Sequence, residues 1–287
     1  MIDDPFVTHR GLLFTVAYEM LGSAVDAEDV VQETWLRWAD VDQEEVRDPR
    51  AYLVRIVTRQ ALNRLRTVSR QREDYVGEWL PEPLLTSPDV AGDAQLAENV
   101  SIAMLTVLET LGPAERAVFV LHEVFETPYD EIAEVVGKTP AAVRQIAHRA
   151  RQHVAERRPR MQVDRAEQEA TLQKFMAAVT SGDVQGLVEL LAPDVVLIAD
   201  GGGLVPAARK PLIGAERVVA FLARVADLSD LIATTAWLNG MPGARFNVAG
   251  GNTAVSLVIE NDLITHIYAI RNPNKLGRLD EMAELRR

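Results

Sequence analysis

Residues 128–151 constrain the fold of this chain more than any other stretch, because they predict two short helices joined by a tight turn. Three apolar residues recur at helical spacing in the first half: Ile132, Ala133 and Val136. Gly137 can take the left-handed backbone conformation that ends a helix. Thr139 can cap the next helix, and Pro140 suits its first position, where the missing N–H would have no partner anyway. The stretch therefore predicts a helix-turn-helix.

The second helix of this motif has one apolar and one polar side. The residues expected to point inward are Val143, Ile146, Ala147, Ala150 and Val154. The residues left on the outside include Arg144, Gln145, His148 and Arg149. Arginine suits guanine and glutamine suits adenine in the major groove, so this side is a candidate DNA-reading face. The alternative is an ordinary helical hairpin with a solvated basic side, because the motif is degenerate.

The 287 residues suit two or three domains and carry a formal net charge of −12, distributed unevenly. Residues 50–72 include seven arginines and no acid, and residues 138–160 include seven Lys or Arg and one acid, Glu156. The acidic total argues against a protein that coats nucleic acid without selectivity. Two basic segments on an acidic body indicate two separate nucleic-acid contacts that need a further partner to bind well.

The chain has no cysteine, which excludes a disulfide framework and a thiolate metal site. No apolar signal region opens the sequence, and no run approaches 18 apolar residues. We therefore expect a cytoplasmic protein without a membrane segment. No pattern indicates a cofactor, a metal site or a catalytic residue.

The first 72 residues predict three helices. The first spans residues 4–21, and the second begins at Asp26, which can cap it. The residues expected on the buried side of the second helix are Val30, Val31, Thr34, Trp35 and Trp38. For its outer charged residues, a solvated face is the simpler interpretation. The third helix starts at Pro49, and we favour phosphate contact for its arginines because no acid compensates them.

Residues 75–93 are rich in proline and acids, which predicts an extended linker. Its motif WLPEP begins at Trp79, which we expect to dock on another part of the chain. Two further helices are expected at residues 95–111 and 114–124. His122 has no partner at metal-ligand spacing, so we expect a structural histidine.

After Arg165 the pattern changes from helices alone to helices followed by strands. The expected helices span residues 171–180, 181–191 and 216–226. The expected strands are VVLIA from Val195, NVAG, TAVSLVIEN and ITHIYAIRN, with Asn261-Asp262 as a hairpin turn between the last two. This order is typical of an α+β domain with a curved antiparallel sheet, which can wrap into a cone around an internal pocket.

Several of these stretches resemble bacterial extracytoplasmic-function (ECF) RNA polymerase sigma factors. DAEDVVQETWLRW (residues 26–38) resembles the segment of region two that grips the β′ clamp helices of the polymerase. The arginine helix resembles the part that melts and reads the −10 element. Residues 114–151 resemble region four, which reads the −35 element and touches the β flap. SGDVQGLVELLAPDVV (residues 181–196) resembles the opening of a SnoaL-like domain of the NTF2-type cone fold.

The resemblance implies a multidomain fold: two all-α sigma domains, the second with the helix-turn-helix, followed by an α+β SnoaL/NTF2-like cone domain. The implied boundaries are 1–72 for sigma region two, 73–94 for the linker, 95–160 for sigma region four and 166–287 for the SnoaL-like domain. The implied partners are core RNA polymerase and promoter DNA, and the implied function is promoter-specific transcription initiation rather than an enzymatic activity.

Site residues follow from the same resemblance. The polymerase-binding residues would be Asp29, Gln32, Glu33 and Trp35. The −10 contacts would be Arg59, Asn63 and Arg66. The −35 contacts would be Arg144, Gln145, His148 and Arg149. Many ECF factors have a basic residue where this chain has Ile146, so we expect the −35 contacts to depart from the common pattern.

Three short motifs resemble the SigJ-type subgroup, whose members carry a fused SnoaL-like extension. They are WLPEP, DGGG and NPNKL. We expect them to meet near one interface, where the extension acts as a built-in regulator and no separate anti-sigma factor is required. The residues of this regulatory interface would be Trp79, Leu80, Pro81, Asp200, Gly201, Gly202, Gly203, Asn272, Pro273, Lys275 and Leu276.

Two alternatives remain. The SnoaL-like domain could be a ligand-binding or catalytic module with Asp200, His266 and Asn272 lining its pocket, although their spacing does not demand catalysis. The sequence does not decide whether that pocket binds a small ligand. The chain could also be a polymerase-independent repressor, but its acidic net charge and its arginine-rich helix argue against this.

Overall fold

The computed structural model describes residues 4–158, 164–226, 231–248 and 251–287. The chain divides into two compact units. Unit 1 comprises Met1–Asp74, Leu105–Arg158 and Glu284–Arg287. Unit 2 comprises Tyr75–Met104 and Pro159–Ala283.

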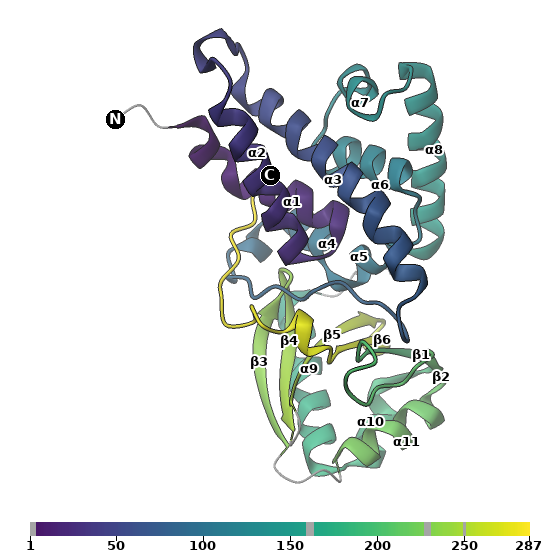
Figure 1. Cartoon of the computed structure of the whole chain (residues 1–287). Coiled ribbons are helices and arrows are strands. Elements are labelled where there is room, and N and C mark those ends of the chain that lie inside the picture. Colours follow the sequence, from purple (N-terminus) through teal and green to yellow (C-terminus); the bar gives the residue numbers. More distant parts are fainter. Residues whose placement is uncertain (1–3, 159–163, 227–230, 249–250) are drawn as a thin grey trace. The chain divides into compact units, whose positions relative to one another are not determined.

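The N-terminal half of unit 1 is a helical bundle. Helices α1 (Pro5–Leu21), α2 (Ala24–Ala39) and α3 (Pro49–Glu73) lie side by side, and the short 3-10 turn η1 (Gln43–Glu45) precedes α3 (Figure 1). Their apolar stripes close a core around the buried Leu13, Met20, Trp38 and Leu53. The expected cap of the second helix is wrong, because the Oγ of Ser23, and not Asp26, accepts a backbone N–H at its start.

The other half of unit 1 contains the predicted helix-turn-helix. Helix α7 (Tyr129–Val136) ends at Gly137, whose φ of 68° is left-handed, and Thr139 caps α8 (Pro140–Arg157) by accepting the N–H of Ala142 at 3.2 Å. The helix-turn-helix prediction is confirmed.

The helices before this motif differ from expectation. Residues 95–111 form two helices, α4 (Ala94–Val100) and α5 (Ile102–Leu108), because Ser101 has an extended backbone between them. Residues 114–124 form α6 (Pro113–Phe119) followed by the π-turn η3 (Val120–Val124).

Unit 2 is built on a six-stranded sheet of order β2-β1-β6-β5-β4-β3. The strands are β1 (Leu191–Asp200), β2 (Leu212–Ile213), β3 (Ile232–Leu238), β4 (Met241–Val248), β5 (Gly251–Glu260) and β6 (Leu263–Ile270). Helices α9 (Arg165–Ser181), α10 (Val184–Leu190) and α11 (Ala215–Ala226) share an apolar core with the sheet (Figure 1). The predicted α+β class is confirmed, but the sheet is mixed, because β1 runs parallel to β6.

The turns between strands explain which strands can be predicted from the sequence. Asn261 and Asp262 both have positive φ angles, as the predicted hairpin requires. A second hairpin at Asn239-Gly240 has φ angles of 53° and 74° and joins β3 to β4. The sequence analysis does not use this turn signal and so contains no β3, and its strand NVAG covers only Asn247 and Val248 of β4, since its other two residues lie outside the described residues.

The predicted linker is extended but is packed into unit 2. Leu80 and Leu84 are buried, and Leu85 forms isolated β-bridges with Leu238 and Met282. Leu80 shares a core with Ile102 and with residues of β3, β5 and β6. The segment is therefore part of the α+β unit and is not a free spacer.

Candidate nucleic-acid interface and buried motif cluster

The three residues predicted to contact the −10 element lie on the outer side of α3. Arg59, Asn63 and Arg66 are exposed, because the opposite side of the helix is buried against α1 and α2. The Nη2 of Arg59 donates to the backbone carbonyl of Glu134 at 2.9 Å. Arg55 lies 3.6 Å from the carboxylate of the same residue. In this structure two arginines of α3 therefore interact with Glu134, in the first helix of the helix-turn-helix.

The four predicted −35 residues share the exposed side of α8. Arg144, Gln145, His148 and Arg149 are all exposed. The guanidinium of Arg144 stacks over the ring of Tyr129 at 5.9 Å, and Arg149 lies 3.6 Å from Glu115. Ile146 is buried in the core, so its side chain takes no part in the exposed face.

The predicted polymerase-binding residues lie on α2. Asp29, Gln32 and Glu33 are exposed, and Trp35 is 45% exposed. The helical pattern placed Trp35 on the buried side, and this is wrong. An exposed tryptophan beside three exposed polar residues is instead typical of a protein-binding surface.

Side chains of α3 form ion pairs and hydrogen bonds with acidic residues of α2. Arg64 bonds Asp26 at 2.5 Å and approaches Asp29 at 3.6 Å, and Gln60 donates to Glu33 at 2.6 Å. The hydrogen bond to Asp26 is the main reason why the pKa of Arg64 is raised.

Asp200 is the centre of a buried polar cluster in unit 2. Its side chain is fully buried and lies at the end of β1. Its carboxylate accepts hydrogen bonds from the hydroxyl of Tyr75 at 2.6 Å, the N–H of Leu80 at 2.9 Å and the N–H of Gly202 at 3.0 Å. The Nζ of Lys275 completes the set at 2.6 Å. A buried carboxylate is stable only when it is paired in this way.

Lys275 connects the three motifs. Its ammonium group also donates to the carbonyl of Leu80 and lies 4.0 Å from the ring centroid of Trp79 and 5.2 Å from that of Tyr75. Asn272 donates to the hydroxyl of Tyr75 at 2.7 Å. The structure thus brings the side chains of WLPEP, DGGG and NPNKL together. Tyr75 lies outside all three motifs, and its hydrogen bonds with Asp200 and Asn272 reveal its place in the cluster.

The remaining predicted interface residues shape the backbone around this cluster. Gly202 has a φ of 60°, and a Cβ there would overlap the side-chain amide of Asn272. A Cβ on Gly203 would press on Val76. Pro81 and Gly201 are buried, Pro273 opens the 3-10 turn η4 (Pro273–Lys275), and Leu276 packs at the edge of the core that contains Leu80.

The inner cavity of the α+β unit does not contain the expected polar residues. It has a volume of about 60 Å³ and an apolar lining that includes Phe175, Phe221 and Phe246. None of Asp200, His266 and Asn272 lines this cavity. His266 stacks on Tyr268 instead, and burial lowers its pKa.

Unit 1 contains a buried charged network that the sequence did not reveal. Glu19 on α1 is fully buried, and burial raises its pKa to about 8. The Nε of Arg116 donates to the carbonyl of Glu19, and both Arg116 and Arg72 bond Glu109. Nothing in the helical pattern of α1 distinguishes this glutamate from an exposed one.

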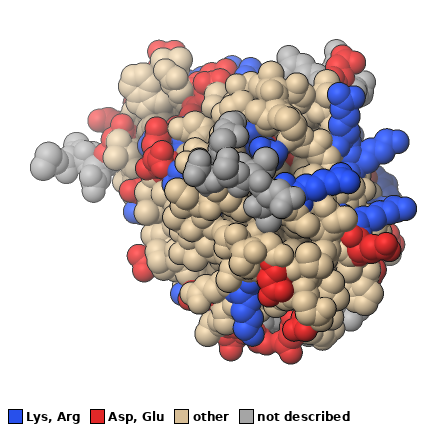
Figure 2. All heavy atoms as spheres, turned by 90° about the horizontal axis from the view of Figure 1, so that it is seen from below, with Lys and Arg blue, Asp and Glu red and all other residues tan. Residues whose placement is uncertain are grey.

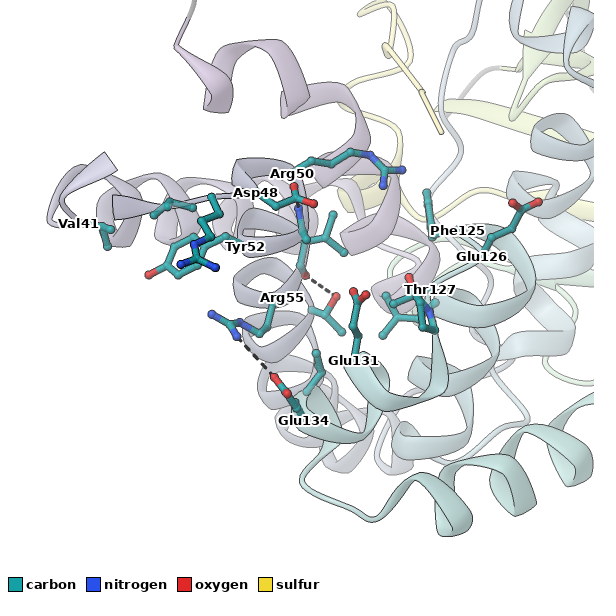
Figure 3. A pocket seen from close by; sticks show the side chains of 18 of the residues that line it. Val41, Asp48, Arg50, Tyr52, Arg55, Phe125, Glu126, Thr127, Glu131 and Glu134 are labelled. Carbon is teal, nitrogen blue, oxygen red and sulfur yellow. Dashed lines mark hydrogen bonds and ion pairs between the residues drawn. The ribbon is translucent and has the colours of Figure 1, made fainter. Parts of the chain in front are cut away.

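A cleft separates the first turns of α3 from α7 in unit 1. Its volume is about 620 Å³. Figure 3 shows Arg50, Tyr52 and Arg55 on the α3 side and Glu131 and Glu134 on the α7 side.

Charge is unevenly distributed over the surface, as the sequence predicts. On the face drawn in Figure 2, most of the surface is uncharged and basic side chains gather at one edge. Within the described residues, no group of three or more His, Asp or Glu could hold a metal ion. No helix in that part of the chain is long and apolar enough to cross a bilayer.

An arginine-rich helix beside a helix-turn-helix, each with an exposed polar face, is the arrangement of a bacterial sigma factor. Residues 6–71 match the Sigma-70 region 2 family and residues 101–154 match the Sigma-70, region 4 family. The chain belongs to the ECF family of RNA polymerase sigma factors, which direct transcription initiation and are not enzymes.

Its relatives include the ECF RNA polymerase sigma factor SigJ of Mycobacterium tuberculosis, which is 36% identical over 94% of this chain and 91% of the relative. The crystal structure of that SigJ matches with a TM-score of 0.78 and covers 96% of this chain and 98% of that chain, at 34% identity. The ferric citrate uptake sigma factor FecI of Escherichia coli is 29% identical over 51% of this chain and 84% of the relative.

Proposed function

We propose that the C-terminal α+β domain controls this sigma factor by fixing the segment that connects its two DNA-reading regions. The observation that carries the proposal is the buried ion pair of Lys275 with Asp200, which ties the segment at Tyr75 and Leu80 to β1. No separate anti-sigma factor is required for such control.

The connecting segment has the length to make this control effective. Tyr75–Met104 joins the two long stretches of unit 1 but belongs to unit 2. A free chain of about 30 residues could span roughly 100 Å when extended. Leu80 is held by Asp200 and Leu84 by the side chain of Asn239, so the segment is not free to extend to that length. The distance available to regions two and four is reduced accordingly.

The contacts of α3 explain why regions two and four would need room to move apart when they bind a promoter. We assign −10 recognition to Arg59, Asn63 and Arg66, where an opened strand offers bases and phosphates. Since Arg59 donates to the carbonyl of Glu134 in α7, it must give up this hydrogen bond to contact DNA, which a larger separation of α3 from α7 would favour. We assign −35 recognition to Arg144, Gln145, His148 and Arg149, and polymerase binding to Asp29, Gln32, Glu33 and Trp35. Fixing the connecting segment therefore restrains promoter binding.

The C-terminal residues provide a second connection. Glu284–Arg287 belong to unit 1, where the N–H of Arg286 donates to the Oγ1 of Thr15 at 3.0 Å and Leu285 is buried. The neighbouring Ala283 donates to the carbonyl of Leu85 in unit 2. The last four residues therefore pack within unit 1, although the residues before them belong to unit 2.

The alternative, a ligand-binding or catalytic module, has less support. A cavity of about 60 Å³ is small beside the roughly 300–1,000 Å³ of common ligand sites. Its lining offers Arg271 and Thr253 as polar groups, and Arg271 is engaged with the carbonyl of Pro206. A small ligand of this domain would need a wider cavity.

Transcription in vitro with core polymerase tests the proposal. Full-length Lys275→Met is compared with the wild type and with Arg278→Met, whose ion pair with Glu281 is exposed. Truncation near Arg165 is less informative, because it would expose the core that Leu80 and Ile102 share with the sheet. We expect Lys275→Met to raise promoter-dependent transcription at least threefold and Arg278→Met to leave it unchanged. Equal activity of all three proteins would refute control through this cluster.

A further inference from the structure

Arg144, Arg149 and Arg151 are exposed arginines of α8 that differ in their partners. Arg149 lies 3.6 Å from a carboxylate of α6, and Arg151 lies 3.3 Å from a carboxylate of η3. The guanidinium of Arg144 instead lies over the ring of Tyr129, 5.9 Å from its centroid, and makes no ion pair or hydrogen bond within the part of the chain that the structure describes. A paired arginine must give up its partner to contact a base, whereas a guanidinium stacked on a ring keeps its N–H groups free. Of these three arginines, Arg144 is therefore the one whose N–H groups are free to bind DNA.

The ring of Tyr129 is itself held in place by His122. The centroids of the two rings are 4.0 Å apart and the interplanar angle is 29°, so the rings stack. The Nδ1 of His122 donates to the carbonyl of Thr127 at 3.1 Å, which fixes the orientation of the imidazole. Both rings are partly buried, whereas Arg144 is exposed. The side chains of His122, Tyr129 and Arg144 thus form a continuous series of contacts that ends at the surface of α8.

An unusual backbone brings His122 beside Tyr129. His122 lies in the π-turn η3, and Glu126 in the following connection has a left-handed φ of 53°. Such π-turns are frequent at functional sites, and a left-handed backbone is costly for a residue with a Cβ. Strain of this kind persists only where surrounding contacts hold it, and the stacking of His122 on Tyr129 is one of these contacts. The backbone therefore points to a function for the two rings.

We propose that Tyr129 is a positioning residue for −35 recognition, which directs Arg144 to one base pair. This role rests on the proposed assignment of Arg144 to the −35 element. A free arginine side chain has many rotamers and can contact a phosphate as well as a base. The face of the ring restricts the plane of the guanidinium, so that two parallel N–H groups can meet the O6 and N7 of a guanine. Tyr129 therefore raises the preference for guanine at that base pair through Arg144.

The effect of the ring should be modest and confined to one base pair. A guanidinium–ring contact at an exposed position changes an equilibrium by roughly two- to fivefold. Removing Arg144 itself removes a bidentate base contact, so the preference for guanine should fall at least fivefold. Preferences that depend on the neighbouring Gln145 should not change, because its side chain is not part of the stack.

Selection of DNA by the assembled holoenzyme tests this role. Full-length protein with core polymerase is incubated with duplexes randomised over the −35 and −10 elements, and the base frequencies of the bound duplexes are measured. Arg144→Ala identifies the position at which Arg144 reads guanine. We expect Tyr129→Leu to lower the guanine preference at that position at least twofold. Tyr129→Phe should keep the preference of the wild type, because phenylalanine retains the ring face.

Tyr52→Leu is the matched control. The guanidinium of Arg55 lies over the ring of Tyr52 at 5.3 Å, in α3 and outside the helix-turn-helix. The substitution removes the same kind of contact from an arginine of region two. It should therefore leave the base preferences of the −35 element unchanged.

The failures of the two assignments are distinguishable. If Arg144→Ala changed no base preference, the assignment of Arg144 to the −35 element would be wrong, and the role of Tyr129 with it. If Arg144→Ala acted but Tyr129→Leu kept the guanine preference, only the positioning role would be wrong. An equal loss at every −35 position in Tyr129→Leu would mean that Tyr129 merely stabilises the helix-turn-helix, which would also overturn the proposal. So would a Tyr129→Phe protein that behaved like Tyr129→Leu.

Discussion

The Nζ of Lys275 lies 2.6 Å from the Oδ2 of Asp200, and both residues are buried. Their positions are 75 residues apart in the chain. The pair fixes the end of β1 to η4, and Leu80 contributes both a donor and an acceptor to it. It is one of the contacts that hold the connecting segment on the α+β domain.

Lys275→Met should destabilise the protein strongly. The substitution leaves the Asp200 carboxylate buried without its cation, and breaking a buried pair in this way costs about 3–5 kcal/mol. The three remaining donors to Asp200 favour the lower end of that range. Urea unfolding measures the loss. Arg278→Met, which removes an exposed pair, should cost less than about 0.5 kcal/mol.

Gly202→Ala tests whether the glycines of DGGG shape the cluster. Gly202 has a φ of 60°, and an added Cβ would meet the amide of Asn272. Left-handed strain for a residue with a Cβ costs about 1–3 kcal/mol, before the overlap is counted. The control is Gly277→Ala, because nothing lies within 4 Å of a Cβ at that position. Similar unfolding midpoints for the two variants would contradict this role.

The buried Glu19 predicts how stability depends on pH. Burial raises its pKa to about 8, while Arg116 and then Arg287 oppose the shift. In the unfolded chain the carboxyl ionises near its ordinary pKa of 4.5. Between these two values the folded protein binds more protons than the unfolded chain, so the free energy of unfolding falls as pH rises. For one group the slope is at most about 1.4 kcal/mol per pH unit.

Glu19→Gln removes this titration. Urea unfolding of the variant between about pH 5 and pH 8 should show a flatter dependence than that of the wild type. Glu28→Gln, at a partly exposed residue paired with Arg10, is the control and should keep the slope of the wild type. Parallel pH profiles for Glu19→Gln and the wild type would show that Glu19 does not titrate in this range.

Arg59→Ala tests the assignment of the −10 helix. In the complex with core polymerase, loss of one phosphate contact should weaken promoter binding and reduce the salt dependence by about 0.7–0.9 in the slope of log K against log salt. Arg10→Ala removes the same charge from an arginine on α1 that is paired with Glu28. If both variants had the slope of the wild type, Arg59 would not contact a phosphate.

Local signals predicted much of the fold. Gly137, Thr139 and Pro140 act as expected around the turn, and Asn261-Asp262 forms the expected hairpin. These features depend on a few adjacent residues, so the sequence contains them directly. The break at Ser101 is not predicted, because packing of the neighbouring residues against the sheet accompanies it, whereas β3 depends on the local turn signal of Asn239-Gly240.

The candidate site was predictable in part. The motif residues identified the cluster of Asp200, Asn272 and Lys275, but not Tyr75, which binds two of them from outside any motif. The hydrogen bond from Arg59 to the carbonyl of Glu134 could not be predicted either, because 75 positions separate the two residues. Such contacts follow from the packing of whole helices and leave no local pattern.

The distance between α3 and α8 tests the central claim most directly. Because the chain has no cysteine, Thr67→Cys and Gln152→Cys at exposed positions allow two spin labels to be attached without further changes. Control by the α+β domain predicts one narrow, short distance in the free protein and a shift to a broad, longer distribution when Lys275→Met is added. The same narrow distribution in both proteins, with Lys275→Met folded, would contradict the claim that the Asp200–Lys275 pair restrains the two DNA-reading helices.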